Sequence, residues 1–539
     1  MRNGEKLTID FGKKMRMPAW EEKKIAYFCY DNTNIIIMRK HFVTALAMVA
    51  CVSAVAATKP MPKLTFDASK GVAGSVTMPQ GQIVHYTAYT NLYYVTHIED
   101  STYQYMNVFV PQGADQHTPI FMRNYVGGYM ASKPQDIDAT DASGRALAEG
   151  YVVVIPGARG RNSAVTDAKG NKVYTGRAPR GLLDLKAAVR YLRLFDKEMP
   201  GDAERIITDG TSAGGAMSSL LGATGNHPAY ANYLKEMGAA DTRDDIYAAV
   251  CYCPIIDLDH ADMAYEWLYG CTNNVSRPLT DAQVAVSKQL AALYPDYLAS
   301  LDLKDEEGHT LNADNYLDYL KKLLIRSAQE AKDAGATIPD SLGFTFSGTK
   351  RFQAPVDGVQ RQPKPQPEGA AARPMRMPSR EVGEYVLDVD LPRYLNYVVS
   401  TIALKTPPAF DSQGVAGARP SPENEEFGDA QGSSVNFTDY SLSQATGNAS
   451  ATIDEETRER VRIMNPMNFI RDSQSSVAPH WYIRHGARDR DTAFPVPINL
   501  ALMLRSVDKD VDFKLPWNRP HSGDYALDEL FRWVKQVAR

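Results

Sequence analysis

The stretch ERIITDGTSAGGAMSSLLGAT, residues 204–224, decides the fold of this chain. An apolar run at Ile206 and Ile207 leads into G-T-S-A-G at Gly210–Gly214, and small residues follow it. Strand, tight turn and helix in this order are the context in which a G-x-S-x-G motif presents a nucleophilic serine. Only small neighbours permit so close an approach of strand and helix. The pattern predicts that Ser212 is a nucleophile, and the alternative is a glycine-rich turn without chemistry.

Apolar runs and helical patterns alternate around this motif. Residues 151–160 (YVVVIPGARG) and 248–257 (AAVCYCPIID) are continuous apolar runs, typical of buried parallel strands. Between them, residues 181–195 (GLLDLKAAVRYLRLF) carry apolar residues at helical spacing. Upstream, Leu64 to Pro111 holds alternating and aromatic-rich runs, which indicate antiparallel strands. The alternation predicts an α/β fold with a mainly parallel central sheet flanked by helices.

The alternation stops between residues 261 and 465 and returns in residues 466–539. The interruption contains helical stretches, a Pro-rich segment from Gln353 to Arg380 and a polar region from Asp411 to Ser450. Long loops of this kind are typical of an insertion and not of a repeat array. We therefore expect a core made of residues 58–260 and 466–539, with a lid domain of residues 261–465 inserted into it.

Composition narrows the function classes. A chain of 539 residues is too long for one compact core, which agrees with an inserted domain. The net charge of -5 argues against a nucleic-acid partner, which needs a basic face. Five cysteines are too few for a disulfide scaffold, and a bridge from Cys251 or Cys253 to Cys271 stays open.

Residues 38–57, MRKHFVTALAMVACVSAVAA, have the pattern of a secretory signal peptide. Two basic residues precede a short apolar run, and Ala54-Val55-Ala56 forms a cleavage site. The run is short for a membrane span. Because a signal peptide begins near the start of a chain, residues 1–37 are predicted to be a mis-assigned extension. We expect a secreted or periplasmic protein, with lipid attachment at Cys51 as the alternative and the only expected link to a membrane.

A serine nucleophile needs a base, and the base needs a carboxylate. In an α/β-hydrolase the chain order is serine, acid, histidine. His521 lies in a loop after the last predicted strand, and Asp489 lies in the loop after the preceding one. This order predicts the triad Ser212, Asp489 and His521. The alternatives for the acid are Asp491, Asp257 and Asp259.

Backbone N–H groups are expected to stabilise the oxyanion of such a serine enzyme. One donor is the N–H of Ala213, the residue after the nucleophile. The other comes from the turn after an early strand, where Gly127 and Gly128 lie between Val126 and Tyr129. A plain β-turn is the alternative interpretation of this segment.

Five segments of the chain together resemble the bacterial tannases, tannin acylhydrolases of the α/β-hydrolase superfamily. They are DGTSAGGAMSSLLGATGNHPAY (209–230), CPIIDLDHADMAYEW (253–267), the Gly-Gly-Tyr turn, and HGARDRDT (485–492) followed by PHSGDY (520–525). The resemblance runs from about residue 75 to the C-terminus. It implies hydrolysis of galloyl esters and depsides with release of gallic acid, without a metal or organic cofactor.

The resemblance also implies residue roles. It assigns the triad to Ser212, Asp489 and His521, in agreement with the chain order. It implies that Lys405, Glu423 and Asp491 bind the galloyl hydroxyls, with Glu425 and Glu426 as alternatives to Glu423. The other functions considered are a feruloyl or other phenolic-acid esterase, and a non-catalytic binding protein on the same scaffold. The oligomeric state stays open.

Overall fold

The computed structural model describes the chain from residue 63 to its end with gaps, as residues 63–270, 272, 277–347, 350–351, 381–382, 385–400 and 402–539. The predicted extension, the signal peptide with Cys51, the whole Pro-rich segment and Cys271 lie outside the described residues. Within the described part, no helix is long and apolar enough to cross a bilayer.

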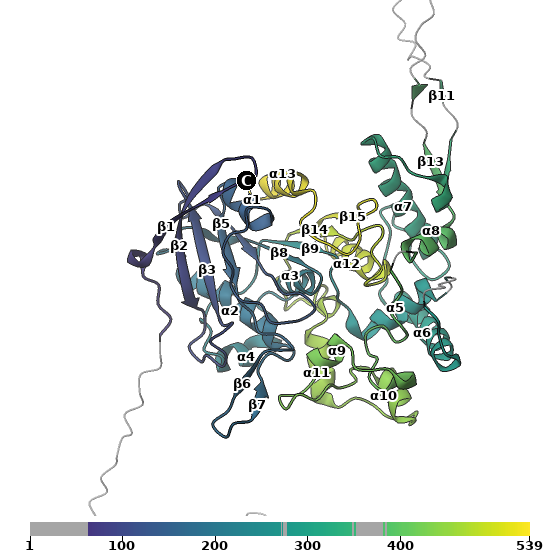
Figure 1. Ribbon diagram of the computed structural model, residues 1–539, viewed down its shortest axis with the longest axis horizontal. Coiled ribbons are helices and arrows are strands. Elements are labelled where there is room, and N and C mark those ends of the chain that lie inside the picture. The colour runs from purple at the N-terminus through teal and green to yellow at the C-terminus, as the bar shows by residue number, and fades with distance from the viewer. Residues whose placement is uncertain are drawn as a thin grey trace, which may run out of the picture. The chain divides into compact units, whose positions relative to one another are not determined.

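In the described residues the central sheet has nine strands, in the order β1-β2-β3-β5-β4-β8-β9-β14-β15 (Figure 1). Neighbours from β1 to β5 are antiparallel, and neighbours from β5 to β15 are parallel. The expected α/β-hydrolase fold is confirmed. The strands are β1 (Val72–Thr77), β2 (Ile83–Tyr93), β3 (Tyr105–Pro111), β4 (Pro119–Arg123), β5 (Val152–Pro156), β8 (Asp202–Thr211), β9 (Ala248–Tyr252), β14 (His480–Arg484) and β15 (Asp510–Lys514).

Helices cover both faces of this sheet. Alternate residues of β5 belong to different buried clusters: Val152 and Val154 pack on one face, and Val153 packs on the other. Apolar side chains on both faces explain why the strand is a continuous apolar run. The first face is covered by α2 (Arg180–Leu194), α3 (Ala213–Ala223) and α12 (Pro495–Arg505), and the second by α1 (Ala142–Ala148) and α13 (Leu527–Val537).

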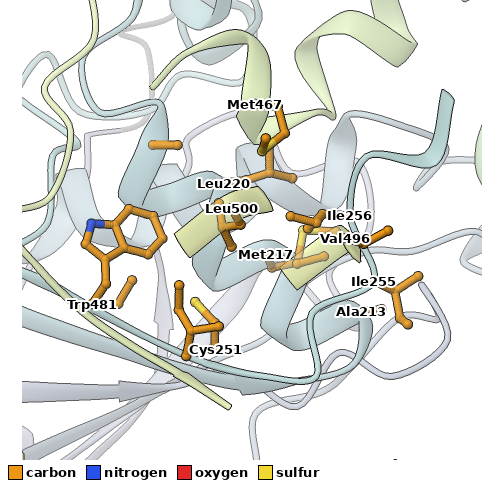
Figure 2. Packing of buried hydrophobic residues seen from close by; sticks show 14 of the residues in the cluster. Ala213, Met217, Leu220, Cys251, Ile255, Ile256, Met467, Trp481, Val496 and Leu500 are labelled. Carbon is orange, nitrogen blue, oxygen red and sulfur yellow. The ribbon is translucent and has the colours of Figure 1, made fainter. Parts of the chain in front are cut away.

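Figure 2 shows the packing on the first face. Trp481 of β14, Leu220 of α3 and Leu500 of α12 are buried in one cluster with Cys251 of β9. The Trp481 ring N–H donates to the Ala478 carbonyl at 2.8 Å, so its one polar atom is satisfied inside the core. This core fixes the ends of β8, β9 and β14, from which the candidate site is built.

Between β9 and β14 runs the inserted segment. Its predicted first border, between residues 260 and 261, falls inside α5, and the domain borders stay predictions. Two short 3-10 turns of the described residues lie in this segment, at Asp340–Leu342 and Val415–Gly417, and three lie outside it, at Ala68–Lys70, Pro228–Tyr230 and Pro466–Asn468. The segment contains α5 (Leu258–Tyr269), α6 (Asp281–Ser300), α7 (Tyr316–Asp333), α8 (Leu391–Val398), α9 (Pro422–Glu426), α10 (Asp439–Thr446), α11 (Glu455–Ile463) and the antiparallel pairs β10 (Phe344–Phe346) with β13 (Val386–Val389) and β11 (Lys350–Arg351) with β12 (Glu381–Val382). Outside it lie α4 (Ala231–Glu236) and the hairpin of β6 (Ala164–Thr166) and β7 (Lys172–Tyr174).

Candidate active site

Ser212 occupies the sharp turn between β8 and α3. Its backbone has φ 62° and ψ -121°, a conformation that a non-glycine residue adopts only under constraint. The constraint is packing: a Cβ atom on Gly210 would lie 2.3 Å from the Gly214 carbonyl oxygen. The Ser212 N–H donates to the Tyr252 carbonyl at 2.9 Å, and the Ser212 carbonyl accepts from the Ile255 N–H at 3.3 Å. These contacts hold the strained serine at the carboxyl end of the sheet.

His521 and Asp489 form a hydrogen-bonded pair. His521 Nδ1 lies 2.8 Å from Asp489 Oδ2 and 3.8 Å from Asp491 Oδ2. Asp489 is fully buried and also accepts the Asp491 N–H at 2.8 Å. Of the acids weighed from sequence, Asp489 is thus the direct partner of His521. Asp257 instead accepts from Tyr297 at 2.6 Å and Asn465 at 2.7 Å.

Burial and charge act in opposite directions on this pair. Burial alone would raise the pKa of Asp489, but the neighbouring His485 and the hydrogen bond with His521 outweigh it, and the net shift is downward. Burial alone would lower the pKa of His521, but the Asp489 hydrogen bond and the Cys253 thiol outweigh it, and the net shift is upward. The acid is therefore kept ionised, and it stabilises an imidazolium.

The histidine loop (residues 520–525) packs against the end of β8. A Cβ atom on Gly523 would lie 1.9 Å from Thr211 Oγ1, the residue before Ser212. His521 Nε2 faces Cys253 Sγ at 4.0 Å. Within the described residues, the Ser212 hydroxyl makes no hydrogen bond with His521 Nε2. Catalytic hydrogen bonds are often long without substrate. The structure brings the histidine loop against the serine turn, but no hydrogen bond joins Ser212 to His521 in the described residues.

The turn predicted to hold an oxyanion, called the oxyanion turn (residues 126–129), follows β4 and adjoins the serine turn. Gly128 and Tyr129 both have φ 55°. Asn124 fixes the approach, because its side-chain amide donates to the Asp209 carbonyl at 3.0 Å and to the Gly214 carbonyl at 3.1 Å. In the described part of the chain the N–H groups of Gly127, Gly128 and Ala213 have no acceptor. They are available to a negatively charged oxygen.

The inserted segment brings Lys405 and Glu423 near each other. Lys405 Nζ lies 3.9 Å from the centroid of the buried Phe410 ring, a cation–π contact. Glu423, on α9, is 8% exposed. Burial raises the pKa of Glu423, and the charge of Lys405 partly offsets this rise. The two predicted galloyl ligands therefore interact electrostatically, although 18 positions separate them.

The two alternatives to Glu423 have different surroundings. The carboxylate of Glu425 pairs with Arg161. Glu426 is 1% exposed, and its Oε2 atom has no partner in the described residues. Burial raises the pKa of Glu426 well above its ordinary value, and Arg177 and Arg161 only partly offset this rise. Glu425 is thus engaged, whereas Glu423 and Glu426 are buried carboxyl groups on one helix.

Sequence analysis missed the role of α5 in positioning these groups. The Tyr265 hydroxyl donates to the Arg490 carbonyl at 2.9 Å, and the Tyr269 hydroxyl to the Asp489 carbonyl at 3.2 Å. Asp262 accepts the N–H groups of Phe410 and Asp411, at 2.8 and 2.9 Å. One helix thereby supports both the loop that carries Asp489 and the loop that carries Lys405. The i, i+3, i+7 spacing of these α5 residues on one helix face is a signal that could have revealed it.

Three groups of side chains in the described residues come close enough to hold a metal ion. Two of the groups already contain hydrogen-bonded pairs. The first is Cys253, Asp489 and His521, in which His521 pairs with Asp489. The second is Asp257, Asp259 and His260, in which His260 Nδ1 lies 2.8 Å from Asp257. The third is on the surface, at Asp305, Glu307 and His309. Surface acidic groups of this kind are common without a metal, and the expected absence of a cofactor stays a prediction.

Comparisons with known proteins show which proteins this chain resembles. The BD-FAE family model matches residues 106–295. No curated protein sequence matches the chain. A tannase structure from Fusobacterium nucleatum is 36% identical with a TM-score of 0.74, covering 88% of this chain and 100% of that one. The tannin acyl hydrolase from Lactobacillus plantarum is 36% identical, with a TM-score of 0.73 and coverages of 88% and 99%. A tannin acyl hydrolase in complex with ethyl gallate is 37% identical, with the same TM-score and coverages.

The fold and these matches define the class first: the protein is a carboxylic ester hydrolase with the α/β-hydrolase fold. Identity above one third over 88% of the chain is specific enough to go further. The chain belongs to the tannase family, the tannin acyl hydrolases, and the resemblance predicted from its motifs is confirmed.

Proposed function

We propose that this protein is a secreted serine esterase that hydrolyses galloyl esters of tannins and releases gallic acid. The strained backbone of Ser212, together with the 2.8 Å contact between His521 and Asp489, supports a serine mechanism most directly. Relatives of similar length support the substrate class, because one was solved in complex with ethyl gallate and another with 3,4-dihydroxybenzoate.

In the proposed mechanism, the Ser212 hydroxyl attacks the ester carbonyl while His521 Nε2 accepts its proton. Asp489 holds the Nδ1 side of the ring and stabilises the imidazolium. The N–H group of Ala213 and the oxyanion turn bind the oxyanion. The imidazolium returns the proton to the leaving alcohol, which gives a galloyl-enzyme. Water, deprotonated by His521, then attacks the acyl carbon, gallate leaves, and the proton returns to Ser212.

The inserted segment is proposed to act as a lid that recognises the galloyl ring. A galloyl ring presents three adjacent hydroxyl groups. Carboxylates of Glu423 and Asp491 accept hydrogen bonds from such hydroxyls, and Lys405 donates to their oxygens. Because these groups are partly desolvated, a ring without hydroxyls leaves them unpaired, and the site rejects it. Burial of Glu423 beside the Lys405 charge supports this assignment.

Gallate release tests the proposal. Protein starting near Thr58 is assayed on methyl gallate and methyl ferulate beside the variant Ser212→Ala. We expect strong hydrolysis of the gallate only, and its loss in the variant. Preference for ferulate would replace the proposal by a phenolic-acid esterase of another specificity. If a serine-reactive fluorophosphonate failed to label Ser212, a non-catalytic binding protein would be the better description.

Export is tested separately. The pattern of residues 38–57 supports cleavage before Thr58. Expression from Met38 in a bacterium, followed by mass spectrometry of the exported protein, should give a chain that starts near residue 58. A chain that starts at Cys51 with added lipid mass would show an anchored protein instead. An uncleaved chain retained in the cytoplasm would contradict export.

A further inference from the structure

Arg161 lies in the loop after β5 and contacts the oxyanion turn twice. Its backbone N–H donates to the Tyr129 carbonyl at 2.8 Å, and its side-chain Nε donates to the Gly128 carbonyl at 2.8 Å. The neighbouring Asn162 adds a third tie, because its side-chain oxygen accepts the Ala131 N–H at 2.7 Å. The loop of Arg161 therefore holds the carbonyl side of this turn.

Holding a carbonyl also fixes an N–H group. In a trans peptide the C=O and N–H groups point in opposite directions. The guanidinium on the Gly128 carbonyl therefore fixes the plane of the Gly128–Tyr129 peptide, which directly follows the predicted donor Gly128. Both residues have φ 55°, which is unfavourable for tyrosine. The turn needs external contacts to stay in this conformation, and Arg161 supplies two of them.

The other end of the same guanidinium reaches the inserted segment. Arg161 Nη1 pairs with the carboxylate of Glu425 on α9, two residues after Glu423. The Arg161 side chain is 17% exposed and that of Glu425 is 42% exposed, so the pair is partly screened by water. The same helix end is anchored nearby, because the Glu426 carbonyl accepts the Ala178 N–H at 2.8 Å.

We propose that Arg161 is a positioning residue that couples the docking of α9 to the conformation of the oxyanion turn. The planar guanidinium contacts the two partners through separate nitrogens, Nε and Nη1, whereas a lysine has a single nitrogen to donate from. Through this link, the helix that carries Glu423 and the turn that faces the ester carbonyl hold one fixed relation. The inference rests on the proposed function for its galloyl substrate, but the hold on the turn acts on any ester.

The test compares two esters in a double-mutant cycle. The variants are Arg161→Met, Glu425→Gln and the double variant, assayed on methyl gallate and on p-nitrophenyl acetate, which has no ring hydroxyls on its acyl group. Arg161→Met should lower kcat about tenfold on both esters, less than the loss of a whole oxyanion donor. Glu425→Gln should lower kcat/KM several-fold on methyl gallate only. The double variant should be no worse than Arg161→Met, because both changes break one link.

Controls separate coupling from misfolding. Arg458→Met removes an arginine–carboxylate pair with Asp439 on the same segment, whose side chains are 45% and 46% exposed, and should leave both activities unchanged. Arg161→Lys keeps the charge, and if Arg161→Met unfolds on heating far below the wild type, the cycle is run with the lysine variant. Unchanged kcat on p-nitrophenyl acetate in the position 161 variants, or losses that multiply in the double variant, would overturn the coupling. Wild-type protein that hydrolyses the acetate but not methyl gallate would refute the galloyl substrate alone, while the acetate data still decide the role of Arg161 in the turn.

Discussion

Substituting Gly523 by alanine should disable the enzyme without unfolding it. The added Cβ atom would lie 1.9 Å from Thr211 Oγ1 and 3.0 Å from the Thr211 Cβ and Cγ2 atoms. Ordinary van der Waals contact needs 3.4 Å or more, so the two groups must separate by about 1.5 Å, the difference between 3.4 and 1.9 Å. Thr211 is fixed in β8 and precedes the strained Ser212, whereas the histidine loop is the softer partner. The displacement therefore falls mainly on His521.

The size of the effect follows from this displacement. A misplacement of a catalytic group by about 1 Å costs about 100-fold in rate. We therefore expect Gly523→Ala to lower kcat on methyl gallate at least about 100-fold, which corresponds to about 2.7 kcal/mol in activation free energy. KM should change little, since Gly523 is not among the proposed galloyl ligands.

A second substitution makes the test specific. Thr211→Ala removes the atoms closest to the new Cβ and leaves only the Thr211 Cβ, at 3.0 Å. The Thr211 hydroxyl has no hydrogen-bond partner in the described residues, so its loss alone should change kcat less than about threefold. In the double variant kcat should recover at least about tenfold over Gly523→Ala.

The assay is steady-state gallate release, with thermal unfolding to check the fold. Gly447→Ala is the control, because its Cβ would meet nothing within 4 Å, although Gly447, unlike Gly523, has a positive φ. It should keep wild-type kcat. Wild-type kcat in Gly523→Ala, or no recovery in the double variant, would refute the reasoning that Thr211 packing sets the position of His521.

Three further expectations concern the His521–Asp489 pair, the proposed galloyl-binding residue Lys405 and the hydrophobic core. His521 must be unprotonated to act as a base, and its pKa is raised, so the pH at which kcat/KM has fallen to half its plateau should lie above the ordinary value of 6.5. Asp489→Asn should lower kcat about 10,000-fold and move this acid limb to lower pH. An unmoved limb in the pH–rate profile would contradict the pairing of His521 with Asp489. Lys405→Met should lower kcat/KM about 10- to 100-fold on methyl gallate but leave p-nitrophenyl acetate within about threefold, and equal losses would place Lys405 outside the ring site. Trp481→Ala should lower the free energy of unfolding by about 3–5 kcal/mol in urea, whereas Leu387→Ala, at a side chain 57% exposed, should change it by less than about 0.5 kcal/mol.

Much of the fold was predictable because it depends on local patterns. The apolar runs of β5 and β9 are buried on both faces and read as strands for that reason. The serine turn was equally readable, since a close approach of strand and helix demands small residues at fixed positions around Ser212. The chain order also placed His521 and Asp489 correctly as neighbours, because parallel strands end at one edge of the sheet.

The tertiary structure decided which of several equivalent residues meet. Asp489 and Asp491 share one loop, and only the folded chain puts one of them 1.0 Å closer to His521 Nδ1, at 2.8 against 3.8 Å. Glu423 and Glu425 lie on the same helix, but one is buried near Lys405 and the other pairs with Arg161 across 264 residues.

Local sequence therefore determined the elements and the motifs within them, because backbone periodicity and turn geometry act over a few residues. It could not determine the contacts of α9, α5 and the loop after β5, which join parts of the chain far apart in sequence. Those contacts depend on how whole elements pack, and packing is set by the combined shape of side chains from many segments at once. The sequence by itself defined an α/β-hydrolase core; only the folded structure decided which side chains hold the oxyanion turn, His521 and Glu423 in place.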